Sequence, residues 1–188
     1  MKINTIPNWI TLIRFLLYVL ILVVLLGNIT WLRPYILPTY ILVFFMDKLD
    51  GWVARTFNQA SEVGQFFDLS VDRAIVTTML ICYLYFYPSV IILILLIANL
   101  IRDFLVAGVR QLAAIKLVFL KAHILGKLKF ITENLSVILM AILLSYPNMG
   151  SYGTIIHESI KWILVLGTIF GWWAFGLYLR QVLSIKQK

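Results

Sequence analysis

The chain has 188 residues, of which 62% are hydrophobic, against roughly 45–50% in ordinary soluble domains, so its composition argues against a soluble domain and predicts a membrane protein. Its formal charge is +8, from 16 Lys and Arg against 8 Asp and Glu. Membrane proteins gather Lys and Arg in cytoplasmic loops, so this charge requires no nucleic-acid partner, and we expect none. The lone Cys82 excludes an intrachain disulfide framework.

Six apolar segments follow one another along the chain, and a membrane-spanning helix takes about 20 such residues. No linker, repeat or low-complexity tract divides them. The sequence therefore predicts an all-α membrane protein with six transmembrane helices in a single domain, residues 1–188. In chain order, the predicted segments are residues 9–26, 35–55, 62–87, 89–115, 124–146 and 156–183.

Basic residues lie mainly at one set of ends and connections of these segments. The positive-inside rule predicts that this side faces the cytoplasm, with both termini. We therefore expect a multi-pass protein of the cell membrane whose turn between the second and third segments is cytoplasmic. The basic residues on this side are Lys2, Arg14, Arg55, Lys116, Lys121, Lys127, Lys129, Arg180, Lys186 and Lys188.

Four aspartates lie on the two segments that flank this turn. An ionised carboxylate within a bilayer is costly, so intramembrane aspartates indicate a functional site. Residues three or four apart share a helix face, which pairs Asp47 with Asp50 and Asp68 with Asp72. In an antiparallel hairpin, residues at equal distance from the turn face each other. The four carboxylates are therefore predicted to converge near the cytoplasmic surface.

Converging carboxylates repel one another unless protons or cations neutralise them. Carboxylate oxygens suit hard divalent ions such as Mg²⁺, Mn²⁺ or Ca²⁺, and a pair of such ions can hold a diphosphate. Arg55 adds a forked donor for phosphate oxygens, and Gly51 leaves room beside the helix. The alternative is a set of interhelical salt bridges from Lys48, Arg55 and Arg73 to the aspartates.

The same hairpin reads Asp-x2-Asp-Gly-x2-Ala-Arg-x8-Gly-x3-Asp-x3-Asp, which resembles the signature of the CDP-alcohol phosphotransferase family at every position. The resemblance implies a six-helix membrane fold, usually a homodimer. It also implies an enzyme that transfers a phosphatidyl or related group from a CDP-linked donor to an alcohol and releases CMP. The matching residues are Asp47, Asp50, Gly51, Ala54, Arg55, Gly64, Asp68 and Asp72.

This resemblance implies a role for each matching residue. The four aspartates would bind divalent cations, two ions of Mg²⁺ or Mn²⁺, and Asp72 would also act as general base on the acceptor hydroxyl. The small residues and the arginine of the pattern would line the CDP site. These donor-site residues are Gly51, Ala54, Arg55 and Gly64.

The amino-terminal Pro-Asn-x-x-Thr-x-x-Arg resembles one branch of the family, that of phosphatidylglycerophosphate synthases. It places Asn8, Thr11 and Arg14 on roughly one face of the first helix, where they could touch the donor head group. Two other interpretations stay open from the residues alone. Asn8 could be a helix N-cap, and Arg14 a snorkelling anchor at the membrane surface.

Two later stretches, residues 101–110 and 126–129, resemble the same branch, which implies CDP-diacylglycerol as donor and glycerol 3-phosphate as acceptor. Their basic residues would bind the phosphate group of the acceptor. Serine or choline carries no phosphate and would need no such pocket. The lysines could instead be positive-inside markers, with Lys129 paired to Glu133, and Arg102 could pair with Asp103. The predicted acceptor-site residues are Arg102, Arg110, Lys127 and Lys129.

Other functions stay open at this point. The same chemistry could serve another acceptor, such as inositol phosphate, serine or phosphatidylglycerol. A divalent-cation transporter would also carry intramembrane carboxylates, but we would expect broken helices or repeated halves in it, and the sequence has no sign of either.

Overall fold

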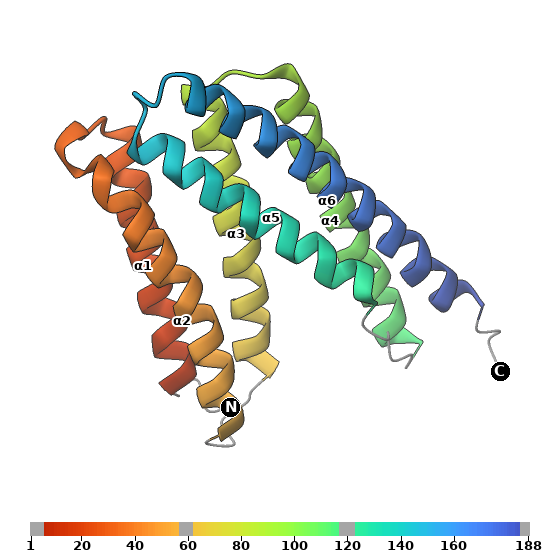
Figure 1. Cartoon of the computed structure of the whole chain (residues 1–188). Helices are drawn as coiled ribbons and strands as arrows, with labels where there is room; N and C mark the ends of the chain where they lie inside the picture. Colours follow the sequence, from red (N-terminus) through yellow and green to blue (C-terminus); the bar gives the residue numbers. More distant parts are fainter. Residues whose placement is uncertain (1–5, 57–61, 117–122, 185–188) are drawn as a thin grey trace. The chain divides into compact units, whose positions relative to one another are not determined.

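A computed structural model describes residues 6–56, 62–116 and 123–184, and these residues form helices and no strand (Figure 1). The prediction of an all-α protein is therefore confirmed for the described part of the chain. Its elements are α1 (Ile6–Leu26), the short 3-10 helix η1 (Thr30–Tyr35), α2 (Ile36–Thr56), α3 (Glu62–Phe86), α4 (Val90–Ile115), α5 (Ile124–Ser145) and α6 (Ser151–Leu183).

Two helices start earlier than predicted. α6 begins at Ser151 rather than at residue 156, where the apolar run begins. Its start directly follows Gly150, whose φ of +52° suits a glycine in a turn. α1 begins at Ile6. Asn8 therefore lies inside the first turn of α1, and the interpretation of Asn8 as the N-cap of this helix is wrong.

Five of the six α-helices in the described residues are long and apolar enough to cross a membrane: α1, α3, α4, α5 and α6. α2 covers the predicted range but is not among these candidates. Its last ten residues carry Asp47, Lys48, Asp50 and Arg55, which lower its hydropathy. The charges that define the predicted site thus set α2 apart from the five candidate membrane-spanning helices.

The helices divide into two compact units. The first contains α1, η1, α2 and α3 with the end of α5 and the start of α6, within residues 1–87 and 137–154. The second contains α4, the first part of α5 and most of α6, within residues 88–136 and 155–188. The single domain expected from the sequence stays a prediction.

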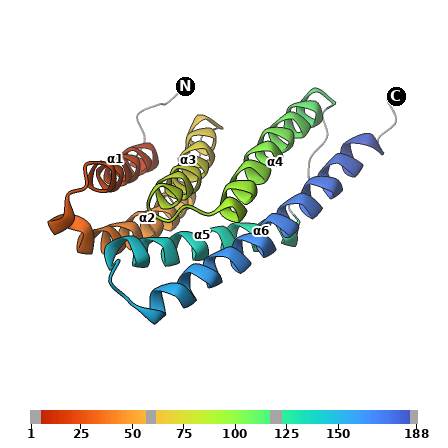
Figure 2. The same ribbon diagram turned by 90° about the horizontal axis from the view of Figure 1, so that it is seen from above.

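In the first unit, α1 packs against both α2 and α3 (Figures 1 and 2). Tyr18 of α1 is 1% exposed and donates a hydrogen bond to the carbonyl oxygen of Ile75 at 3.0 Å. Its hydroxyl also lies 2.6 Å from that of Thr78 on α3. A buried hydroxyl needs such partners, so Tyr18 fixes the rotation of α1 against α3. Arg14 lies one helical turn earlier on α1.

In the second unit, α4 and α5 both pack closely on α6. Asn99 of α4 donates a hydrogen bond to the Thr168 hydroxyl of α6 at 2.8 Å. A Cβ atom added to Gly167 of α6 would lie only 2.6 Å from the Thr132 hydroxyl oxygen of α5. Glycine therefore allows an approach of α5 and α6 at which a larger residue would force Thr132 to shift.

Candidate functional site

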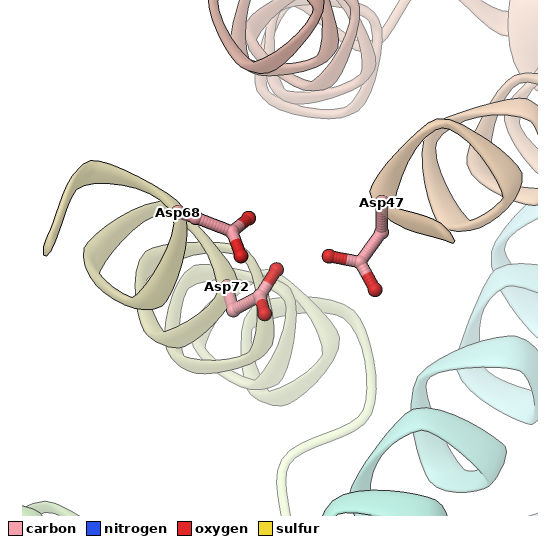
Figure 3. Close-up of side chains that lie close together, drawn as sticks. All are labelled: Asp47, Asp68 and Asp72. Atoms are coloured by element: carbon pink, nitrogen blue, oxygen red, sulfur yellow. The ribbon is translucent and has the colours of Figure 1, made fainter. Parts of the chain in front are cut away.

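Three aspartates from two neighbouring helices meet in the first unit. Asp68 and Asp72 lie one turn apart on α3 and point toward Asp47 of α2 (Figure 3). One carboxylate oxygen of each lies within 4.8 Å of the others. All three residues are partly buried. The structure thus brings together three of the four aspartates that the sequence singled out.

Among the described side chains, Arg14 of α1 is a cation that pairs with this cluster. Its guanidinium forms ion pairs with Oδ1 of Asp47, with Oδ1 of Asp68 at 2.7 Å and with Oδ1 of Asp72 at 3.2 Å. Arg14 is 0% exposed. The guanidinium has five N–H donors in a planar fork, which lets one side chain serve several carboxylates. Arg14 therefore ties α1 to both helices of the carboxylate hairpin.

The sequence left Arg14 as a surface anchor or a donor-site residue and did not predict this role. The salt-bridge alternative named Lys48, Arg55 and Arg73 as partners of the aspartates. Lys48 lies over the Phe44 ring, with its amino nitrogen 4.9 Å from the ring centroid. The signal that could have identified Arg14 is its isolation, as the only charged residue within the apolar run Trp9–Leu26.

The donor set of this cluster fits a divalent cation. Three carboxylates against one guanidinium leave the described cluster with net negative charge. Each of these ion pairs joins Arg14 to the Oδ1 atom of an aspartate, and every carboxylate has a second oxygen with its own lone pairs. Oxygen ligands of this kind are those that Mg²⁺ and Mn²⁺ prefer. These residues could therefore hold a metal ion.

Of the other predicted donor-site residues, only Thr11 has a side chain in the described part of the structure. Thr11 lies three residues before Arg14 on α1 and is buried, with 8% of its surface exposed. It therefore occupies the same region of α1 as the arginine. The predicted residues whose side chains lie outside the described part are Asn8, Asp50, Gly51, Ala54, Arg55 and Gly64.

A second charged cluster is buried in the second unit. Arg102 of α4 forms an ion pair with Asp103 at 2.5 Å, and its Nε donates to the Gly171 carbonyl oxygen of α6 at 3.1 Å. Lys129 of α5 pairs with Asp103 at 3.4 Å and with Glu133 at 2.8 Å. Arg102 and Lys129 are 6% and 8% exposed. Both predicted pairs, Lys129 with Glu133 and Arg102 with Asp103, are present.

The four predicted acceptor-site residues fall into two groups. Arg102 and Lys129 share the carboxylate of Asp103, whereas Arg110 and Lys127 are exposed side chains. The sequence did not predict that Asp103 would join the two buried cations. The only sequence signal for this pairing was that Asp103 directly follows Arg102. It is a weak signal, because adjacent residues of a helix do not normally face one another.

Residues 4–177 match the sequence model of the CDP-alcohol phosphatidyltransferase family, so the chain belongs to this family. It is accordingly a phosphatidyltransferase-type enzyme, and its apolar helices make it a multi-pass membrane protein. The family match covers both units. It agrees with the resemblance seen in the eight-position pattern between Asp47 and Asp72.

Several relatives carry the name CDP-diacylglycerol–glycerol-3-phosphate 3-phosphatidyltransferase. The protein of Mycoplasma pneumoniae is 27% identical, over 97% of this chain and 89% of its own length. That of Rickettsia typhi is 29% identical, over 88% of this chain and 92% of its own length. A CDP-diacylglycerol–inositol 3-phosphatidyltransferase of Arabidopsis thaliana is 36% identical over 48% of this chain and 39% of its own length.

Proposed function

We propose that this chain transfers the phosphatidyl group of CDP-diacylglycerol to glycerol 3-phosphate, giving phosphatidylglycerophosphate and CMP. The observation that carries the proposal is the carboxylate cluster of Asp47, Asp68 and Asp72 in a member of this family. The names of the relatives that match most of the chain support the choice of donor and acceptor.

Asp47, Asp68 and Asp72, with Asp50 from the sequence pattern, would hold the divalent ions, Mg²⁺ or Mn²⁺. When bound, such ions neutralise a diphosphate and stabilise the CMP leaving group. In phosphoryl-type transfer, positioning and electrostatics supply most of the catalysis. The chain's own contribution is therefore to fix the carboxylates, and the packing of α1 on α2 and α3 supports that task.

Asp72 is the proposed general base. In the reaction, the acceptor hydroxyl oxygen forms a bond to the phosphorus that carries the diacylglycerol, and the bond from that phosphorus to the CMP oxygen breaks. The hydroxyl proton passes to the Asp72 carboxylate, which needs hydrogen-bond contact with the hydroxyl. The residues proposed to line the donor site are Asn8, Thr11, Gly51, Ala54, Arg55 and Gly64.

Arg102 and Lys129 are the proposed ligands of the acceptor phosphate, with Arg110 and Lys127 as further candidates. The support is chemical, because two buried cations form a strong pair of donors for a phosphate oxygen. An acceptor without a phosphate group would make no use of them. Asp103 and Glu133 hold these cations in the absence of the acceptor.

The proposed location is the cell membrane, with both termini and the active site in the cytoplasm. The distribution of Lys and Arg along the sequence supports this orientation. The homodimer implied by the family resemblance stays a prediction.

Acceptor-dependent CMP release tests the proposal. Purified protein in detergent, given CDP-diacylglycerol, should release CMP only when glycerol 3-phosphate and Mg²⁺ or Mn²⁺ are both present. EDTA should abolish the release, and excess Mn²⁺ should restore it. Release in EDTA at the same rate would contradict the ion requirement.

Inositol is the second candidate acceptor, and the Arabidopsis relative is the observation that favours it. This relative matches only about half of the chain, so it supports the shared chemistry more than the acceptor. The same assay distinguishes the two cases. CMP release with inositol or inositol phosphate, and none with glycerol 3-phosphate, would reassign the acceptor.

A further inference from the structure

Arg14 pairs with all three aspartates that are the candidate ligands of a divalent cation. It contacts the Oδ1 atoms of Asp47, Asp68 and Asp72, which come from two helices, and it is fully buried. Three carboxylates at this separation repel one another strongly when nothing neutralises them. The guanidinium removes much of this repulsion without any ion. Arg14 therefore neutralises part of the carboxylate charge that a divalent ion would otherwise neutralise.

Arg14 and a divalent ion would also oppose each other. Both are cations, and both would draw on the same three carboxylates. Like charges a few ångströms apart repel strongly at the effective dielectric constant of a protein site. Oxygen lone pairs that accept from Arg14 are in addition unavailable to an ion. The affinity of the cluster for a divalent ion is then lower than its carboxylates alone would provide.

We propose that Arg14 is a built-in counter-ion of the carboxylate cluster, which holds the ion-free cluster together and lowers its affinity for divalent ions. This inference rests on the proposed role of Asp47, Asp68 and Asp72 as ion ligands. It makes Arg14 a positioning residue rather than a catalytic one. It also couples the ion to the donor, because the negative diphosphate offsets the repulsion between the ion and Arg14.

A Mn²⁺ titration of the purified protein without donor tests the competition. Free Mn²⁺ is counted by electron paramagnetic resonance, so the readout does not depend on activity. Arg14→Gln should bind Mn²⁺ at least about tenfold more tightly than the unchanged chain, since each factor of ten is only 1.4 kcal/mol. Arg14→Lys, which keeps the charge but loses the fork, should fall between the two.

Arg33→Gln is the matched control, because it removes the same charge from the same unit. Arg33 donates to the Asn28 side chain at 2.6 Å and lies over the Phe86 ring, so its described contacts include no carboxylate. Its Mn²⁺ affinity should equal that of the unchanged chain. An Arg14→Gln variant with unchanged or weaker Mn²⁺ affinity overturns the inference.

Thermal unfolding tests the structural half of the inference. In EDTA, Arg14→Gln should unfold at a lower temperature than the unchanged chain. Mg²⁺ should raise the unfolding midpoint of Arg14→Gln by more than it raises the midpoint of the unchanged chain. A variant that is folded only with Mg²⁺ supports the inference, and one that stays unfolded at every Mg²⁺ concentration overturns it. If neither the unchanged chain nor Arg14→Gln binds Mn²⁺, the proposed ion site itself is wrong.

Discussion

The Nε–H of Arg102 on α4 donates a hydrogen bond to the carbonyl oxygen of Gly171 on α6, 3.1 Å away. A Cβ atom at Gly171 would lie 3.4 Å from that same Nε and 3.4 Å from Cγ of Lys129. Glycine at this position therefore lets both buried cations lie directly against the backbone of α6. The guanidinium thus donates to Gly171 through Nε and pairs with Asp103 through a terminal nitrogen.

Replacing either buried cation should weaken acceptor binding. We expect Arg102→Gln and Lys129→Gln to raise the KM for glycerol 3-phosphate by roughly ten- to hundredfold, because each removes a charge-assisted hydrogen bond. The KM for CDP-diacylglycerol should change much less. The measurement is CMP release at varied acceptor concentration. Lys161→Gln, which breaks an exposed pair with Glu158, is the control and should change neither constant.

Asp72→Asn should remove the general base while keeping the shape of the side chain. We expect kcat to fall by at least about a hundredfold, with binding of the CDP donor still measurable. CMP release and donor binding are measured on the same preparation. Glu158→Gln makes the same carboxylate-to-amide change at an exposed position and should stay fully active. Full activity of Asp72→Asn would rule out the assigned base.

Gly167→Ala should destabilise the contact between α5 and α6. The added Cβ atom would lie 2.6 Å from the oxygen of the Thr132 hydroxyl, and the O–H of this hydroxyl donates to backbone carbonyl oxygens of α5. Overpacking of this kind costs about 1–3 kcal/mol. Thermal unfolding in detergent should show a lower midpoint. The double variant Gly167→Ala with Thr132→Ala removes the 2.6 Å contact with the hydroxyl oxygen and keeps the 3.3 Å contact with the Thr132 Cβ atom, so its midpoint should recover part of the loss.

Tyr18→Phe should loosen α1 against α3. The variant loses a hydrogen bond to the Ile75 carbonyl oxygen and leaves the Thr78 hydroxyl without this neighbour. We expect the free energy of unfolding to fall by about 1 kcal/mol. Tyr152→Phe, at a residue that is 73% exposed, is the control. An equal loss in both variants would show that the hydrogen bond to α3 is not responsible.

The carboxylate hairpin could be predicted because its information is local. A spacing of four residues puts Asp68 and Asp72 on one face of any helix, and a short turn makes the two helices antiparallel. These two rules are enough to bring Asp47 close to them, and the structure has the three together. The fold class was equally accessible, because apolar segments of spanning length can be read without knowing their neighbours.

The partner of the hairpin could not be predicted in the same way. Arg14 reaches Asp47 and Asp68 only because α1 packs beside α2 and α3 with one particular rotation. That rotation depends on contacts between residues far apart in the sequence, such as Tyr18 with Ile75. Helical spacing alone leaves it undetermined. The same holds for Arg102 and Lys129, which lie on different helices and meet through Asp103.

The buried cluster of the second unit contains two cations, Arg102 and Lys129, and two carboxylates, Asp103 and Glu133, so its formal charges cancel. An anion that enters it takes one cation from a carboxylate and leaves that carboxylate unbalanced in a setting of low dielectric constant. Uptake of an anion is therefore an exchange of partners, which stays electrically neutral only if a positive charge enters with the anion. A neutral ligand does not start that exchange.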